Sequence, residues 1–398
     1  MAAVRDAVEK ARSVDDTLLA RMRAIAYGSY SSCDTQDSSC SRGLPVVPDP
    51  TWSIQEVSLW WASLSQLQRS RLISSHPDAV GNLDGVPTWA RDRANRLMLE
   101  RLIAKAQRDI DAIKALRATG KPYPVHQPLA VIEKQLAELE AVKSLLVGST
   151  SSAPYSLLTL DPKGVRLKAA VGIGDVHTAE HVAVLVPGMG TNVRDSLEYY
   201  TGAAQRLRVT TPVDVDEVAV VAWLGYEAPQ SLETPDFSVV STDKATRGAE
   251  SLTPFLEGIH NSRIHNGSTD PHLTLLGHSY GSTTSARAMT QIVPKVVDDF
   301  VMFGSPGGSA NSADEYGVVP GHAYVSGVPT GDLVQGIGPD WAFGTNPMRM
   351  PDITHITGDA TGSPSYDPHS RGFANHSTYL DPGTETLRQI AKIVGGGR

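Results

Sequence analysis

A sharp turn between an apolar strand and a helix of small residues limits the possible folds of this chain more than any other feature. Residues 272–277 are expected to form the strand and residues 281–292 the helix, and Gly277-His-Ser-Tyr-Gly281 joins them. Glycine at both ends lets the helix approach the strand, and the turn raises the Ser279 hydroxyl above the sheet. Because Gly-X-Ser-X-Gly can arise by chance, the prediction of a nucleophilic serine depends on this strand–turn–helix context. The alternative is a tight turn without a reactive role.

The C-terminal part of the chain alternates short apolar runs with helical segments. Strands are expected at 165–171, 181–187, 217–224, 272–277, 298–303, 322–327 and 353–357, and helices at 194–208, 241–262, 281–292 and 384–394. Central runs such as 181–186 and 217–222 are apolar on both faces. A parallel sheet covered by helices on both sides requires such strands. The sequence therefore predicts an α/β domain over residues 151–398.

Residues 1–150 are expected to form an all-helical region. Apolar residues recur with helical spacing over 91–119 and 129–147, and glycine ends both segments, which predicts an antiparallel helical hairpin. The serine-rich residues 28–52 are expected to be a flexible link.

Shorter signals lie inside this N-terminal region. Ser53 with Glu56 has the spacing of a capping box that begins a helix, as does Ser65 with Gln68. The Trp60-Trp61 pair is expected to pack in a core, and a hydrophobic lid is the alternative. The cysteines, Cys33 and Cys40, could form a local disulfide or remain free thiols.

Charge and hydropathy exclude several classes of partner. The chain has 35 Lys and Arg against 43 Asp and Glu, a net charge of −8, so it offers no basic field for nucleic acid or anionic membrane. No run approaches the roughly 18 apolar residues of a membrane span. The first 27 residues have no apolar signal-peptide core, so export by the general secretory route is not expected.

A serine hydroxyl becomes a nucleophile when an imidazole removes its proton and a carboxylate fixes the tautomer of that imidazole. The downstream candidates are Asp332, Asp340, Asp352, Asp359, His322, His355, His369 and His376. Asp332 follows the expected strand at 322–327, and His376 lies in a polar loop before the last helix. Acid and base are expected at these places, so Asp332 and His376 are predicted to complete a triad with Ser279. Asp359 and His369 remain the alternatives.

Acyl transfer also requires two donors for the oxyanion. The N–H of Tyr280, which follows the serine, is expected to be the first, and Met189 or Gly190 in the loop after the strand at 181–187 the second. A dinucleotide-binding loop is the competing interpretation of Gly188-Met-Gly190, but Val193 stands where that motif needs its third glycine.

No metal or other cofactor is expected. His177 and His181 are four residues apart but enter a strand, so their side chains should point apart, and no His-Glu-X-X-His motif occurs. Trp223 and Tyr226 follow another strand end and, with His278, are expected to line a substrate pocket; covering the sheet edge is the alternative for the aromatic pair. Residues 336–351 could form a cap over the cleft or an ordinary loop.

Several motifs resemble those of an actinobacterial α/β-hydrolase family long catalogued as a domain of unknown function. They are Val186-Pro-Gly-Met-Gly-Thr-Asn192, Trp223-Leu-Gly-Tyr-Glu-Ala-Pro229, Gly277-His-Ser-Tyr-Gly281, Phe303-Gly-Ser-Pro-Gly307 and His376-Ser-Thr-Tyr-Leu380. The segments Trp60-Trp-Ala-Ser-Leu-Ser65, Pro77-Asp-Ala-Val-Gly-Asn-Leu-Asp-Gly-Val-Pro87 and Arg91-Asp-Arg-Ala-Asn-Arg96 resemble the helical region that precedes this domain. The resemblance implies an α/β-hydrolase fold with a triad at Ser279, Asp332 and His376, and it fixes no substrate. Some members resemble type VII secretion substrates, so the expected location is the cytoplasm or export by a type VII-like route.

The sequence as a whole predicts a serine hydrolase that acts on a small-molecule or lipid ester through an acyl-enzyme. Two alternatives remain open. One is a non-catalytic binding or secretion-associated protein on a hydrolase scaffold, and the other is an acyltransferase with the same triad.

Overall fold

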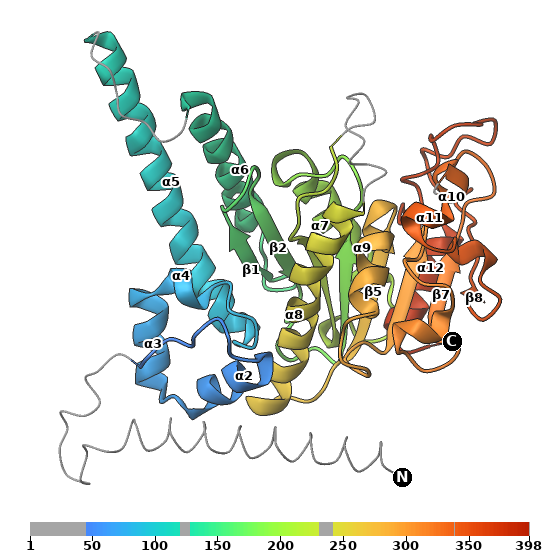
Figure 1. Cartoon of the computed structure of the whole chain (residues 1–398), viewed down its shortest axis with the longest axis horizontal. Helices are drawn as coiled ribbons and strands as arrows, with labels where there is room; N and C mark the ends of the chain where they lie inside the picture. The colour runs from blue at the N-terminus through green and yellow to red at the C-terminus, as the bar shows by residue number, and fades with distance from the viewer. Residues whose placement is uncertain (1–44, 120–127, 231–241, 338, 398) are drawn as a thin grey trace.

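The computed structural model describes residues 45–119, 128–230, 242–337 and 339–397. Their centre is an eight-stranded sheet in the order β1-β2-β4-β3-β5-β6-β7-β8 (Figure 1). The strands are β1 Tyr155–Asp161, β2 Lys168–Ile173, β3 His181–Val186, β4 Val218–Leu224, β5 His272–His278, β6 Asp299–Phe303, β7 Ala323–Ser326 and β8 Thr354–His355. The pairs β1–β2 and β2–β4 are antiparallel, and all the others are parallel. The predicted α/β architecture is confirmed.

Helices cover both faces of the sheet. They are α2 Ile54–Ser63, α3 Gln66–Ser75, α4 Pro77–Val80, α5 Thr88–Ala118, α6 Leu129–Val147, α7 Val193–Thr210, α8 Asp243–His265, α9 Tyr280–Met289, α10 Val334–Ile337, α11 Asp340–Phe343 and α12 Glu385–Val394. In β3, Val182 and Val184 point into a core shared with α8 and α9, and Ala183 and Leu185 into a core shared with α6, α7 and α12. This alternation explains why the strand is apolar on both faces.

The N-terminal helices agree with the sequence patterns. Both predicted capping boxes are present, and they begin α2 and α3. Salt bridges from Lys114 to Glu133 and from Lys143 to Glu100 join α5 to α6 in the antiparallel order expected of a hairpin. Trp60 and Trp61 are buried in a small core formed by α2–α5, as predicted. Cys33, Cys40 and most of the expected link at 28–52 lie outside the described residues.

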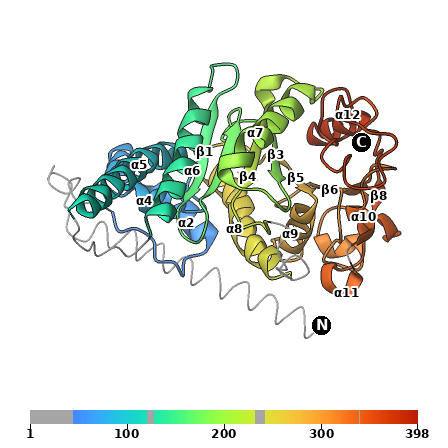
Figure 2. The same ribbon diagram turned by 90° about the horizontal axis from the view of Figure 1, so that it is seen from above.

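The sequence did not predict strand β1. Its sequence, Tyr-Ser-Leu-Leu-Thr-Leu-Asp, is rich in leucine rather than in β-branched residues, and it pairs antiparallel at the edge of the sheet. Side chains from the α4–α5 segment cover its outer edge. Asn82 accepts from Leu160 N and donates to Leu160 O, both at 2.9 Å, and Asp92 accepts from Leu157 N at 2.6 Å. Side chains of the helical segment thereby bond the outer backbone groups of the edge strand, which another strand would otherwise bond. Figure 2 shows α5 and α6 beside β1 at one end of the sheet.

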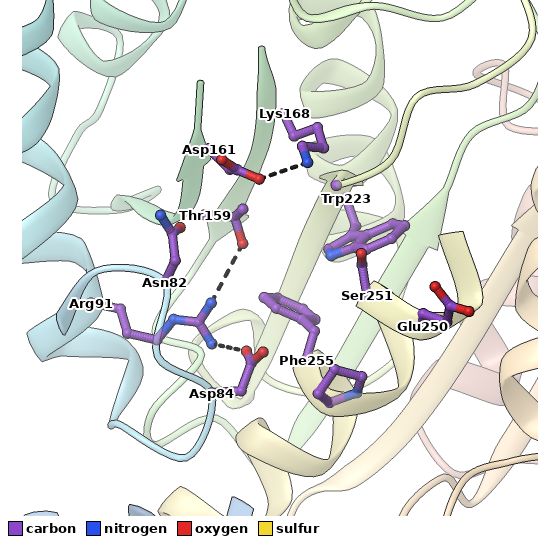
Figure 3. A pocket seen from close by; sticks show the side chains of 12 residues that line it. Asn82, Asp84, Arg91, Thr159, Asp161, Lys168, Trp223, Glu250, Ser251 and Phe255 are labelled. Carbon is purple, nitrogen blue, oxygen red and sulfur yellow. Dashed lines mark hydrogen bonds and ion pairs between the residues drawn. The ribbon is translucent and has the colours of Figure 1, made fainter. Parts of the chain in front are cut away.

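A polar pocket of about 260 Å³ lies where the N-terminal segment meets the sheet (Figure 3). The buried Arg91 guanidinium pairs with Asp84 at 2.5 Å, and Lys168 pairs with Asp161 at 2.6 Å across the pocket. Its other lining residues include Asn82, Thr159, Trp223, Glu250, Ser251 and Phe255.

Every helix in the described part of the chain is too short or too polar to cross a bilayer.

Candidate active site

Ser279 lies on the turn between β5 and α9, in a backbone conformation that residues other than glycine rarely adopt. Its φ is 56° and its ψ is −134°. Such a conformation costs about 1–3 kcal/mol and persists only where the surroundings enforce it. The Ser279 N–H donates to Phe303 O at 3.0 Å, which anchors the turn to the neighbouring strand β6.

The two glycines of the turn are required by close approach of the backbone. A Cβ on Gly277 would lie 2.5 Å from Ser282 Cα, and one on Gly281 would lie 2.3 Å from Val186 O. No larger residue fits at either place, because both obstructing atoms belong to the backbone. The sequence-based explanation of these glycines is therefore confirmed.

His376 and Asp332 come together, although 44 residues separate them. His376 Nδ1 lies 2.9 Å from Asp332 Oδ1, and the other carboxylate oxygen accepts a 2.5 Å hydrogen bond from Tyr379 OH. The Asp332 side chain is fully buried. Burial alone would raise the pKa of Asp332, but hydrogen bonds from His376 and Tyr379 outweigh it and hold this pKa below its usual value. The carboxylate is thus an ionised acceptor for the imidazole.

Gly304 makes room for this pair at the end of β6. Its φ is +57°, and a Cβ there would lie 3.0 Å from His376 Cε1 and 3.2 Å from Asp332 Oδ2. A side chain at this position would therefore disturb both residues. In the sequence this glycine was noted only as part of the Phe303–Gly307 motif, without a role.

The other candidate acids and bases lie in different surroundings. His322 pairs with Asp299 at 2.8 Å, and His355 and His369 are exposed. The remaining acids bond elsewhere: Asp340 to Arg349, Asp352 to Ser312 and Asp359 to Thr361. The alternatives Asp359 and His369 therefore have no partner of the required kind among these contacts.

The structure does not join Ser279 to His376 by a hydrogen bond. Neither Ser279 Oγ nor His376 Nε2 has a bonding partner among the described residues. The residue before the serine lies close to the candidate base, since the ring of His278 is 4.8 Å from the ring of His376, centroid to centroid. Because Nδ1 of His376 is bonded to Asp332, Nε2 is the nitrogen left for a proton from another group.

The loop after β3 lies directly against the serine. A Cβ on Gly188 would lie 2.8 Å from Ser279 Oγ and 2.9 Å from Tyr280 N. The expectation that Gly190 supplies an oxyanion donor is wrong, because its N–H donates to Pro229 O at 2.7 Å. Met189 N–H has no acceptor within the described ranges, which leaves Met189 as the candidate donor from this loop.

His278, which was expected to line a substrate pocket, is largely buried, and its ring stacks on Phe303 with centroids 5.1 Å apart. Its Nε2 lies 2.8 Å from His376 O, and its Nδ1 lies 3.4 Å from Tyr200 OH. It thus contacts the backbone of the candidate base.

Trp223 and Tyr226, the aromatic pair expected to line a substrate pocket, pack against one another and against the loop after β3. Their rings stack with centroids 5.9 Å apart, and Tyr226 OH donates to Pro187 O at 2.7 Å. Tyr226 therefore supports the loop after β3 from behind. Trp223 lines the pocket of Figure 3, whose lining includes none of the three candidate triad residues.

Two apolar side chains near the candidate triad residues in the sequence are exposed to solvent. Leu333 follows Asp332 and Phe373 precedes His376 by three residues; they are about half exposed at 49% and 47%, and Leu333 N donates to Gly372 O at 3.2 Å. Residues 336–351 contain α11 and a short 3-10 helix at Pro347–Arg349. In the described ranges no cluster of histidine, cysteine and carboxylate side chains has the arrangement of a metal site.

Sequence reasoning missed two tyrosines that contact the site. Tyr379 lies three residues after His376 in the His376–Leu380 motif, so its proximity to the base could have been noticed. Tyr200 is 78 residues from its partner His278, and no local signal points to it.

Comparison with known proteins agrees with this architecture. Residues 161–342 match a family model described as alpha/beta hydrolase. The uncharacterized protein Rv2079 of Mycobacterium tuberculosis is 29% identical over 416 residues, which cover 95% of this chain and 61% of the relative. The chain thus spans less than two thirds of that relative. The uncharacterized protein Rv0963c of the same organism is 36% identical over 235 residues, which cover 56% of this chain and 83% of the relative.

Solved structures show a more distant likeness. Carboxyl esterase 2 of Tuber melanosporum is 13% identical and covers 62% of this chain and 89% of its own, with a TM-score of 0.38. A likeness at this level does not bear on activity. The family model, the Rv0963c match and the eight-stranded sheet together establish that the chain belongs to the alpha/beta hydrolase family.

Proposed function

We propose that this protein is a serine hydrolase that cleaves acyl esters through Ser279, His376 and Asp332. The observation that carries the proposal is that the imidazole of His376 is bonded to a buried carboxylate, while its backbone oxygen is bonded to His278, the residue before Ser279 on its strained turn. His376 Nε2 takes the proton from Ser279 Oγ as the oxygen attacks the acyl carbonyl. Asp332 keeps the proton on Nδ1 and stabilises the imidazolium. His376 next donates this proton to the departing alcohol as the acyl C–O bond breaks and the acyl-enzyme forms. Water, deprotonated by the regenerated His376, then attacks the acyl-enzyme, and the proton returns to Ser279 Oγ as the acid leaves.

The oxyanion would be bound by the backbone N–H groups of Tyr280 and Met189. Support comes from Gly188, since the absence of its side chain brings this loop against Ser279 and Tyr280. Two fixed donors cost no reorganisation during the reaction, and the loss of one typically costs about 3 kcal/mol of transition-state stabilisation.

The open Ser279–His376 hydrogen bond is compatible with this mechanism. Catalytic hydrogen bonds are often long or poorly aligned without substrate and tighten in the substrate complex. We expect the serine hydroxyl to reach Nε2 when an acyl group occupies the site.

The surroundings favour an ester with an apolar group. Leu333 follows Asp332, Phe373 precedes His376 by three residues, and both side chains are about half exposed. Such side chains can cover an acyl chain and remove its surface from water. We therefore expect a small-molecule or lipid ester, with activity that rises from acetyl to longer acyl chains.

Ester hydrolysis by matched serine variants tests the proposal. With p-nitrophenyl esters of graded chain length, Ser279→Ala should lower kcat/KM by about ten-thousandfold or more, because the nucleophile is lost. Ser285→Ala is the control. This serine lies in α9, is buried, and its hydroxyl has no hydrogen-bond partner, so its removal should leave kcat/KM within about twofold. A wild-type protein without esterase activity, or an active Ser279→Ala variant, would contradict the proposal.

A further inference from the structure

His278 connects the nucleophile turn to the loop that carries the candidate base. It immediately precedes Ser279 in the chain, and its ring Nε2 lies 2.8 Å from the backbone oxygen of His376. Other hydrogen bonds of the base loop lead to the acid loop or to α7, as in the 2.9 Å bond from Asn375 N to Gly331 O and the 3.0 Å bond from Tyr199 OH to Ser377 O. The imidazole of residue 278 thus links two segments that are 98 residues apart in the sequence.

The contacts of this imidazole determine its tautomer. A carbonyl oxygen can only accept, so Nε2 of His278 must carry the proton and donate to His376 O. Nδ1 is then an acceptor, and Tyr200 OH, at 3.4 Å, is the donor. A chain of two hydrogen bonds therefore runs from Tyr200 on α7 through His278 to the backbone of His376.

Aromatic neighbours fix the plane of the ring. His278 stacks on Phe303 with an interplanar angle of 22°, and Tyr379 lies 6.0 Å away between ring centroids. With both ring nitrogens bonded and both neighbours buried, the side chain has little freedom to rotate.

The ring is also neutral. Burial, with a smaller contribution from the nearby His376, lowers the pKa of His278 to about 3. A second positive ring beside His376 would oppose formation of the imidazolium during catalysis, and a neutral ring avoids this repulsion.

We propose that His278 is a positioning residue that holds His376 at the distance from Ser279 that proton transfer requires. The inference rests on the proposed function and adds a residue to it. Asp332 fixes the ring of His376 through Nδ1, and His278 fixes the backbone from which that ring extends. Both restraints are needed, because a misplacement of about 1 Å can lower a rate by about a hundredfold.

Three variants test this role through kcat, KM and the unfolding midpoint. His278→Leu removes the donor and should lower kcat by about 10- to 100-fold with KM within about twofold. His278→Gln can place a side-chain N–H near the position of Nε2 and should recover most of kcat. Tyr200→Phe removes the donor to Nδ1 and should lower kcat by a smaller factor. His369→Gln, at an exposed histidine, is the control and should behave as wild type.

A purely structural role predicts another pattern. If His278→Leu and His278→Gln lost kcat equally, in proportion to a lowered unfolding midpoint, or if His278→Leu kept the wild-type kcat, the positioning role would be rejected. If His278→Leu does not fold, kcat and the unfolding midpoint of Tyr200→Phe and His278→Gln are compared with those of wild type. A loss of kcat in proportion to a lowered midpoint would again reject the positioning role.

A measurement without substrate separates this inference from the proposed function. The proton that His376 Nδ1 shares with Asp332 should give a far-downfield signal in the proton NMR spectrum of the wild type, and this signal should broaden or vanish in His278→Leu. An unchanged signal in that variant would overturn the positioning role even if Ser279 proved inactive. Loss of the signal in a protein without esterase activity would contradict only the proposed function.

Discussion

Some residues of the site could be predicted from the sequence around them, whereas others depend on contacts with residues far away in the chain. Ser279, Gly277 and Gly281 could be predicted because the strand, the turn and the helix that require them are contiguous. Asp332 and His376 could be selected by their positions after expected strands and before the last helix, and the structure brings this pair together. The contacts of His278 could not be foreseen, because its partners are 78 and 98 residues away and one of them is a backbone oxygen.

The neutral His278 has a consequence for acid stability. Its pKa falls from a usual value of 6.5 to about 3 on folding, so below pH 6.5 the unfolded chain binds a proton that the folded chain does not. The contribution of His278 to the free energy of unfolding has its full value above pH 6.5 and is lost as the pH falls toward 3. At about 1.4 kcal/mol per pH unit, wild type should lose about 2 kcal/mol more than His278→Gln between pH 6.5 and pH 5.

Urea unfolding at these two pH values measures the difference. His369→Gln provides the comparison, because this histidine is exposed and should leave the pH dependence of the free energy of unfolding at its wild-type value. Equal pH dependence in wild type and His278→Gln would show that the ring of residue 278 is not kept neutral by burial.

At the scale of elements, the helices and the parallel strands follow their sequence patterns, whereas the edge strand β1 does not. Parallel central strands are long apolar runs, and α5 and α6 have regular spacing, so both kinds are visible in the sequence. Strand β1 depends on tertiary contacts, since Asn82 and Asp92 satisfy its outer backbone groups. The segment 77–96 was noted in the sequence only for its resemblance to a family motif. One of its structural roles is to bond the outer edge of β1.

Removal of one edge contact should destabilise the protein and expose a site for strand pairing. Asp92→Ala leaves Leu157 N without its acceptor, and we expect a loss of about 1–3 kcal/mol in the free energy of unfolding together with concentration-dependent self-association. Asp109→Ala, in the same helix, removes only a surface pair with Lys105 and should cost about 0.5 kcal/mol or less.

Urea unfolding and light scattering measure both effects. An Asp92→Ala variant that unfolds like Asp109→Ala and stays at its original molecular mass would show that the side-chain cover of β1 is dispensable.

At the scale of the molecule, the sequence suggested a boundary near residue 150, but the core continues across it. Leu99 of α5 and Leu139, Val142 and Leu146 of α6 belong to the same buried cluster as the inner residues of β1–β4. The far end of the hairpin differs, since Ala106, Ile110, Ile113 and Ile132 form a separate small cluster. The change of texture in the sequence therefore marks a change of secondary structure and not of hydrophobic core.

Hydrogen exchange should reveal this shared core. Amides around Val142 in α6 and Val171 in β2 should exchange with the same free energy of opening, because one cooperative unit contains both. Amides around Ile113 should exchange with a smaller free energy, since their cluster is small and remote from the sheet. If α6 opened well below the sheet, the helical region and the sheet would be separate folding units.

The most direct test of the central claim is to find which atom a serine-directed inhibitor modifies. After reaction with a fluorophosphonate, peptide mapping by mass spectrometry should place a single adduct on Ser279 in the wild type, and His376→Ala should react at least about a hundredfold more slowly, because the base is lost. An unmodified Ser279, an adduct on another residue, or an unchanged rate in His376→Ala would contradict the account.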